Sequence, residues 1–279
     1  MVKNVENILY VIGFQRSGTT LLCHLLDKHP EITCAEEPEI TKRITYEQFD
    51  LLKDPEFDSI RKSLEFYGID KKEYVFLVNN YLTSKFDTHT FIRKCYELFN
   101  KKNAKITGAK EVCDLTAFNY DYLTKLSTYH ENKIKIVFIE RDPKGVVNSF
   151  RKMGFFPPGR KEICFSNLKK FVKEYLKCMN YIYKNLLHLN THYLLYEDLI
   201  NDSTKELKKI YEFLNVDSSN KIINDILVRN SKGIRINFNG VKNNFMKEWN
   251  QTLNDNEKKW IEKKYNKFKK KMNSYIAIR

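Results

Sequence analysis

The feature that most constrains the fold is the stretch VIGFQRSGTTLL, residues 11–22, in which an apolar run meets two glycines and leads into a leucine-rich segment. The run ILYVIGF has the β-branched and aromatic residues of a buried strand, and the leucines after Gly18 recur at helical spacing until Pro30. A strand, a tight glycine turn and a helix in this order are typical of loops that bind phosphate groups. We therefore expect an anion-binding turn here.

This turn departs from the phosphate-binding pattern G-x-x-x-x-G-K-[ST] at one position. Gly13, Gly18 and Thr20 match the pattern, but Thr19 stands where the pattern requires lysine. The loop therefore lacks the cation that reaches the β and γ phosphates of a nucleoside triphosphate. Arg16 is the only charged residue in the loop, and its planar guanidinium suits two oxygens of a terminal anionic group. Three hydroxyls add hydrogen-bond donors to the backbone amides: those of Ser17, Thr19 and Thr20.

A second strand and helix are predicted in KIKIVFIERDPKGVVNSF, residues 133–150. A buried strand over Ile134–Ile139 is followed by Asp142 as N-cap and Pro143 at the first helical position. Arg141 leaves the end of this strand and Ser149 lies two turns along the helix, so both could hold a second phosphate. Taken alone, the segment is equally compatible with a surface arginine and a solvent-facing serine. Its combination with the first loop favours the phosphate-binding interpretation.

Strands alternate with helical segments over the rest of the chain. We expect helices over 73–86 and 90–101, a strand within AKITGAK (104–110), a strand within HYLLYEDL (192–199) and a helix over 203–214. This alternation predicts an α/β fold with a P-loop-like central parallel sheet flanked by helices, and a ligand crevice at the carboxyl ends of the strands. We find no repeat and no linker, so a single domain over residues 1–279 is expected. Residues 153–165 are the best candidate for a mobile loop.

The charge balance favours anionic partners, since 49 Lys+Arg against 35 Asp+Glu among 279 residues give a net charge of +14. Much of this excess lies in NEKKWIEKKYNKFKKKM, which we interpret as a helix docked by its aromatic face and not as a nucleic-acid stripe. No apolar run is long enough for a membrane helix and no signal peptide is evident, so a cytoplasmic location is expected. The six cysteines form no C-x-x-C pair, and free thiols are expected.

Two segments together resemble a known family. RSGTTLL and LLDKHPEI, followed some 120 residues later by IVFIERDPKGVVNSF, resemble the sulfotransferases that use 3′-phosphoadenosine 5′-phosphosulfate (PAPS). The resemblance implies the sulfotransferase fold, a first loop that binds the 5′-phosphosulfate and a second segment that binds the 3′-phosphate. It also implies a hydroxyl-bearing acceptor, possibly anionic, and 3′-phosphoadenosine 5′-phosphate (PAP) as product, with no metal, nucleic acid or membrane partner. A donor ending in a sulfuryl group needs no γ-phosphate lysine.

Within this family the chain resembles the tyrosylprotein sulfotransferase branch in KHPEITCAEEPEI, residues 28–40. The resemblance implies that Glu36 is the catalytic base and that Lys110 and Arg16 stabilise charge on the transferred group. It further implies that Ser231 and Lys232 in NSKGIR contact the nucleotide. Other positions differ, since Ala35, Glu111 and Val112 replace the glycine and the Asp-Pro of the branch. Cys113 follows Lys110 instead of preceding it, so the branch's disulfide to Cys34 is not carried over.

Several alternatives stay open at this stage. We expect burial to raise the pKa of Glu36, but Glu37 or Glu39 could replace it as base. His24 is expected to pack inside its helix, and His29 to end it. The acceptor could be an acidic peptide tyrosine, a sugar hydroxyl or a phenolic metabolite. A P-loop-type small-molecule kinase and a non-enzymatic nucleic-acid-binding protein are the competing functions, and the missing loop lysine counts against the kinase.

Overall fold

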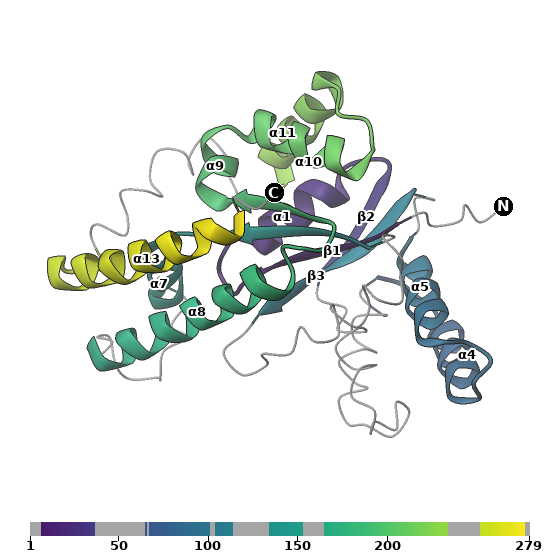
Figure 1. Cartoon of the computed structure of the whole chain (residues 1–279). Helices are drawn as coiled ribbons and strands as arrows, with labels where there is room; N and C mark the ends of the chain where they lie inside the picture. The colour runs from purple at the N-terminus through teal and green to yellow at the C-terminus, as the bar shows by residue number, and fades with distance from the viewer. Residues whose placement is uncertain are drawn as a thin grey trace. The chain divides into compact units, whose positions relative to one another are not determined.

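The computed structural model describes residues 7–36, 65, 67–100, 104–113, 134–152, 165–233 and 252–276 (Figure 1). Five strands and nine helices have assigned bounds within these ranges. They are β1 Asn7–Phe14, α1 Thr19–Asp27, β2 Ile32–Glu36, α4 Lys71–Leu82, α5 Thr88–Phe99, β3 Ile106–Cys113, β4 Ile134–Glu140, α7 Pro143–Lys152, α8 Phe165–Asn185, β5 Thr191–Leu195, α9 Tyr196–Asn201, α10 Ser203–Leu214, α11 Asn220–Gly233 and α13 Asp255–Ile276.

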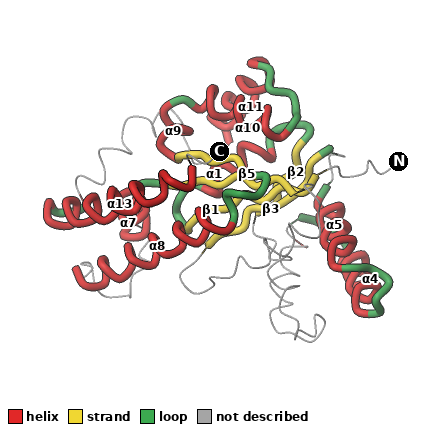
Figure 2. The backbone as a smooth tube through the Cα atoms, in the orientation of Figure 1, coloured by secondary structure: helices red, strands yellow, loops and turns green. Residues whose placement is uncertain are grey.

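The strands form one parallel sheet in the order β2-β3-β1-β4-β5, which Figure 2 shows in yellow. Every residue of β4 is buried, and in β1 all but the first are, which explains why both segments are continuous apolar runs in the sequence. From β1 the chain continues to β2 at one edge of the sheet, whereas from β4 it continues to β5 at the opposite edge. The direction in which strands are added therefore reverses between β1 and β4. Parallel sheets bind ligands at the carboxyl ends of such strands. The predicted α/β fold with a central parallel sheet is confirmed.

The chain divides into two compact units. The first contains residues 1–11, 20–111 and 119–136, and the second contains 12–19, 112–118 and 137–279. Three strands of the sheet are divided between the units, since β1, β3 and β4 each contribute residues to both. The prediction of a single domain stays a prediction.

The first unit is built around the start of β1. A Cβ at Gly108 of β3 would lie 1.8 Å from the carbonyl oxygen of Leu9, so only glycine allows this approach of the two strands. Tyr10 and Tyr96 meet edge to face in the core, with ring centroids 6.0 Å apart. Helices α4 and α5 lie side by side and begin at Asp70 and Asp87, whose carboxylates accept hydrogen bonds from first-turn amides.

The second unit packs aromatic side chains against the end of β1. Phe14 contacts the rings of Phe150, Phe171 and Tyr175, which come from α7 and α8. Helix α13 lies beside α8 (Figure 1) and buries an apolar face that includes Phe268. This agrees with the predicted docking of the lysine-rich C-terminal segment through its aromatic face.

Several predicted elements need correction. The segment HYLLYEDL is not one strand, because β5 ends at Leu195 and Tyr196 begins α9. The strand β2 was not predicted, since its five residues show no alternation. Cys178 is disulfide-bonded, against the expectation of free thiols, because pairing depends on proximity in space and not on sequence spacing. The mobile loop predicted over 153–165 lies outside the described residues except for Phe165, which begins α8. No helix in the described ranges combines the length and the apolar character needed to cross a bilayer.

Candidate active site

The glycine turn has the backbone of an anion-binding loop. Arg16 and Gly18 both adopt positive φ angles, of 65° and 96°, while Ser17 between them donates its amide to the carbonyl of Phe14. Such alternation turns successive N–H groups toward one concave surface, which favours a bound anion. The hydroxyl of Ser17 is fully buried and has no hydrogen-bond partner among the described residues. A ligand with anionic oxygens would satisfy this donor.

The two glycines of the turn are required for different structural reasons. Gly18 has a positive φ, and a Cβ there would lie 2.3 Å from the ring of Tyr196. Gly13 has no such φ, but its Cβ would lie 2.7 Å from the carbonyl oxygen of Ile139 on β4. At Gly13 the structure shows close packing of β1 against β4.

Arg141 follows β4 and reaches the turn. Its guanidinium donates a hydrogen bond of 2.8 Å to the carbonyl of Arg16 and stacks on the ring of Tyr196, 4.3 Å from the centroid. Arg16 in turn donates from Nε to the hydroxyl of Ser149 at 3.0 Å. Arg141 is 4% exposed, and this burial lowers its pKa. The structure thus brings together Arg16, Arg141 and Ser149, which the sequence had predicted from two segments 125 residues apart.

The start of α7 fixes the position of Arg141. Asp142 accepts a hydrogen bond of 2.7 Å from the amide of Lys144, which confirms the predicted N-cap. A Cβ at Gly145 would lie 2.8 Å from Nε of Arg141, so glycine makes room for the guanidinium.

A second group of predicted residues lies in the first unit. Lys110, near the end of β3, is 3% exposed and donates to the hydroxyl of Thr20 at 2.7 Å. Its ammonium also pairs with Oε1 of Glu36 at 3.0 Å. Strands β2 and β3 run parallel with Glu36 opposite Lys110, which explains why two residues 74 positions apart meet.

Glu36 is held on both carboxylate oxygens. Nε2 of His24 lies 3.3 Å from Oε2. The backbone amide of Glu36 donates a hydrogen bond of 2.5 Å to the hydroxyl of Tyr67. Burial alone would raise the pKa of Glu36, but Lys110 and His24 together outweigh it and lower that pKa. The expected raised pKa is therefore wrong. The expected packing of His24 is also wrong, because its side chain is 34% exposed; His29 does follow the end of α1.

The structure describes other predicted site residues only in part. Ser231 and Lys232 lie in the last turn of α11, and their side chains lie outside what the structure describes, as do those of Glu37 and Glu39. Cys34 is a buried free thiol, as expected, and its hydrogen bond with Cys23 together with burial raises its pKa.

Sequence reasoning missed three residues around these groups: Tyr67, Tyr196 and Glu197. The amide of Asp142 donates to the carboxylate of Glu197 at 3.1 Å, and burial raises the pKa of that carboxyl. Burial also raises the pKa of Tyr67, to about 12. The sequence pattern placed Tyr196 and Glu197 only in a predicted strand, and no pattern marked Tyr67.

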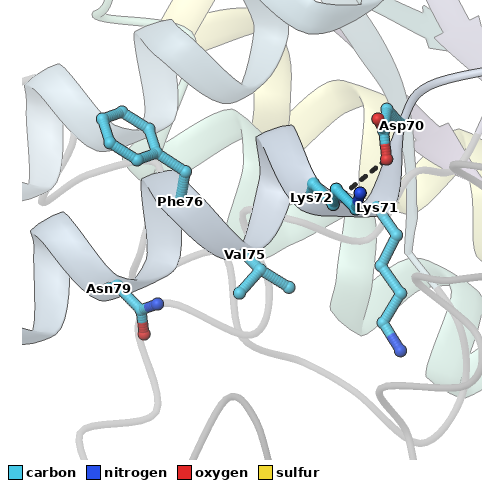
Figure 3. Close-up of a pocket in the computed structure, with 6 residues that line it drawn as sticks. All are labelled: Asp70, Lys71, Lys72, Val75, Phe76 and Asn79. Atoms are coloured by element: carbon cyan, nitrogen blue, oxygen red, sulfur yellow. Dashed lines mark hydrogen bonds between the residues drawn. The ribbon is translucent and has the colours of Figure 1, made fainter.

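A pocket of about 510 Å³ opens beside α4 and contains none of the predicted site residues. Figure 3 shows the six residues that line it, which come from α4 and its N-cap: Asp70, Lys71, Lys72, Val75, Phe76 and Asn79. Within the described part of the chain, no group of three or more His, Cys, Asp or Glu side chains is arranged to hold a metal ion.

The fold and the loops define a class: an α/β protein with a lysine-free P-loop-like turn whose backbone geometry suits an anion. The family model described as the sulfotransferase family matches residues 9–220. The chain belongs to this sulfotransferase family.

Individual relatives are distant or short. A 37-residue segment is 51% identical to nodulation protein NoeE of Sinorhizobium fredii (strain NBRC 101917 / NGR234), which covers 13% of this chain and 9% of that protein. The structure resembles the sulfotransferase domain of the Synechococcus PCC 7002 olefin synthase, with a TM-score of 0.53, 16% identity and coverage of 79% of this chain and 77% of that one. It also resembles mouse sulfotransferase SULT7A1 complexed with PAP, with a TM-score of 0.56, 15% identity and coverage of 98% and 90%. At these identities the two structures support the fold alone.

Proposed function

We propose that this protein transfers a sulfuryl group from PAPS to the hydroxyl of an acceptor, producing a sulfate ester and PAP. The bond between sulfur and the donor's phosphate oxygen breaks, a bond between sulfur and the acceptor oxygen forms, and the hydroxyl proton passes to a protein base. The observation that carries the proposal is the turn at residues 13–19, which has two positive φ angles. Its buried Ser17 hydroxyl lacks a hydrogen-bond partner in the described part of the chain, and both features suit an anionic group. A PAP complex among the similar structures is consistent with it.

Donor binding is attributed to residues of the second unit. The turn would hold the 5′-phosphosulfate through its backbone amides and the hydroxyls of Ser17 and Thr19, with Gly13 and Gly18 giving the turn its shape. Arg141 and Ser149 would hold the 3′-phosphate, and the hydrogen bonds that join them to Arg16 couple the two phosphate contacts. Ser231 and Lys232 stay candidates for further nucleotide contacts.

The chemical step is attributed to three charged residues. Glu36 would accept the acceptor proton, and Lys110 would stabilise negative charge that develops on the transferred group while it holds the hydroxyl of Thr20. Arg16 would share the charge stabilisation. Catalysis of this kind rests on positioning and charge, as in phosphoryl transfer.

The lowered pKa of Glu36 bears on the acceptor. A weakly basic carboxylate takes a proton more readily from a phenol, with a pKa near 10, than from the much less acidic hydroxyl of a sugar. We therefore propose a phenolic or tyrosyl hydroxyl as the acceptor, which agrees with the resemblance of residues 28–40 to the tyrosylprotein branch. The net charge of +14 would favour an acceptor that carries negative charge.

The test combines binding with turnover. Calorimetric titration with PAP should show binding to the wild-type protein, and Arg141→Ala should weaken it strongly while Glu36→Ala spares it. Incubation with PAPS and a panel of acidic tyrosine peptides, sugars and simple phenols, read by mass spectrometry, should show added sulfate on phenolic acceptors. Glu36→Ala should abolish this transfer.

Lys173→Ala serves as the control, because it removes an exposed positive charge from α8 of the second unit, away from the proposed contacts. It should leave both PAP binding and transfer unchanged. Wild-type protein that binds no PAP would refute the donor, and sulfate found on sugars but not on phenols would refute the acceptor class.

A further inference from the structure

A buried polar cluster lies immediately before Arg141 and takes no part in the proposed chemistry. Its centre is Glu140, the last residue of β4, whose side chain is 0% exposed. Three tyrosine hydroxyls contact its carboxylate: those of Tyr183 at 2.5 Å, Tyr193 at 2.6 Å and Tyr265 at 2.8 Å. Lys269 lies 3.2 Å from the same carboxylate. We call these five residues the Glu140 cluster; they come from β4, α8, β5 and α13.

The hydrogen bonds in the Glu140 cluster form a closed network. The ammonium of Lys269 donates to the carboxylate and to the hydroxyls of Tyr183 and Tyr193, at 2.8 and 2.9 Å, and so all three of its protons have acceptors. Burial, reinforced by the neighbouring carboxylate, raises the pKa of all three tyrosines, so each keeps its proton as a donor. A fully satisfied buried network specifies one arrangement of the elements that contribute to it.

That arrangement continues along the backbone into the site. The hydroxyl of Tyr175 donates to the carbonyl oxygen of Arg141 at 2.6 Å, and Tyr175 and Tyr183 both belong to α8. The next amide, of Asp142, is bound by Glu197. Three successive residues at the end of β4 are therefore each held by a different partner: Glu140 through its side chain, Arg141 through its carbonyl and Asp142 through its amide.

We propose that the Glu140 cluster positions Arg141 and thereby sets the preference of the nucleotide site for a 3′-phosphate. The proposal rests on the proposed function, since it takes Arg141 as the 3′-phosphate contact. Buried ionic groups contribute little net stability compared with apolar residues of the same size. A cluster of this kind, placed one residue before the guanidinium, is better explained by the geometry that it imposes. Tyr265 and Lys269 of the C-terminal helix are then positioning residues of the site.

The measurement that separates positioning from stability is a ratio of affinities. PAP and adenosine 5′-monophosphate (AMP) differ only in the 3′-phosphate, so the ratio of their dissociation constants reports the contribution of that group. Tyr265→Phe keeps the ring but removes one donor to Glu140, and Lys269→Met keeps the length but removes the ammonium. We expect each variant to reduce the preference for PAP over AMP by about threefold to tenfold, because a displaced charged contact costs of the order of 1 kcal/mol.

Lys267→Met is the matched control, since Lys267 lies on the exposed side of the same helix. It should keep the wild-type ratio, and Lys269→Arg should restore part of the preference lost in Lys269→Met. A folded Tyr265→Phe variant with the wild-type ratio would overturn the proposal, even if its melting temperature falls. Tyr265→Phe is the milder change and remains informative if Lys269→Met does not fold. If the wild-type protein binds neither nucleotide, the proposed function fails as well.

Discussion

Gly145 offers a direct test of the position of Arg141. In Gly145→Ala the new Cβ would lie 2.8 Å from Nε of Arg141, whereas ordinary contacts begin near 3.4 Å. The guanidinium must therefore move by about 0.6 Å, as the difference between these distances shows. This movement would disturb its contacts with the carbonyl of Arg16 and the ring of Tyr196.

The expected loss follows from the strength of a charged hydrogen bond. A hydrogen bond to a charged group contributes about 1.5–3 kcal/mol, and each 1.4 kcal/mol corresponds to tenfold in affinity. Loss of the contact between Arg141 and the 3′-phosphate should weaken PAP binding about tenfold to a hundredfold. The free energy of unfolding should change little. Alanine is more favourable than glycine in a helix by up to about 1 kcal/mol. This gain would be offset by a similar loss from the weakened hydrogen bond between Arg141 and Arg16.

The assay is calorimetric titration of wild-type protein and Gly145→Ala with PAP and with AMP, alongside thermal unfolding. We expect PAP affinity to fall, AMP affinity to change by less than about threefold, and the melting temperature to stay close to that of the wild type. Unchanged PAP affinity in a folded variant would show that Arg141 does not contact the 3′-phosphate. Equal losses for PAP and AMP would show that the substitution disturbs the whole turn.

Four further predictions concern the first unit. Because Lys110 and His24 lower the pKa of Glu36, the active carboxylate should persist at mildly acidic pH, and kcat/KM should fall only as the pH drops through that lowered pKa. The stability contributed by these contacts should be lost over the same acidic range, as urea unfolding at several pH values would show. His24→Ala removes one of the two lowering contacts, so the acid limb of the pH–rate profile should move to higher pH with PAP affinity unchanged; an unmoved limb would contradict the role of His24. Gly108→Ala should reduce the free energy of unfolding by about 3 kcal/mol or more in denaturant titrations, since its Cβ meets the backbone of Leu9 at 1.8 Å, and a wild-type midpoint would refute this.

The fold was largely predictable where strands are buried on both faces. The runs that became β1 and β4 are continuous and apolar, and each ends at a residue pattern that opens a helix. Shorter strands carried less information. The strand β2 has only five residues. The strand β5 ends at Leu195 because Tyr196 begins α9, and the ring of Tyr196 packs where a side chain at residue 18 would lie. Such boundaries depend on tertiary packing, which local patterns do not contain.

The charged residues of the candidate site could be predicted from the sequence, but the groups that surround them could not. Arg16, Arg141 and Ser149 came from two recognisable segments, and the structure brings them together. The pKa of Glu36 was predicted with the wrong sign because burial was considered without its partners. His24 shows why. Helical spacing placed it among leucines, but it could not show that β2 brings the carboxylate of Glu36 next to the His24 ring.

The chain has no lysine in the glycine turn, but it has a buried lysine on β3. Thr19, in the lysine position, is 4% exposed, and a lysine there would have to bury its charge. The next residue, Thr20, instead accepts a hydrogen bond from Lys110, which β3 supplies from 90 positions further along. The ammonium of Lys110 contacts both Glu36 and Thr20, so these contacts fix the position of the charge relative to the proposed base. Moving the lysine back into the loop by Thr19→Lys, combined with Lys110→Met, should therefore fail to restore transfer, and restored turnover would refute this coupling.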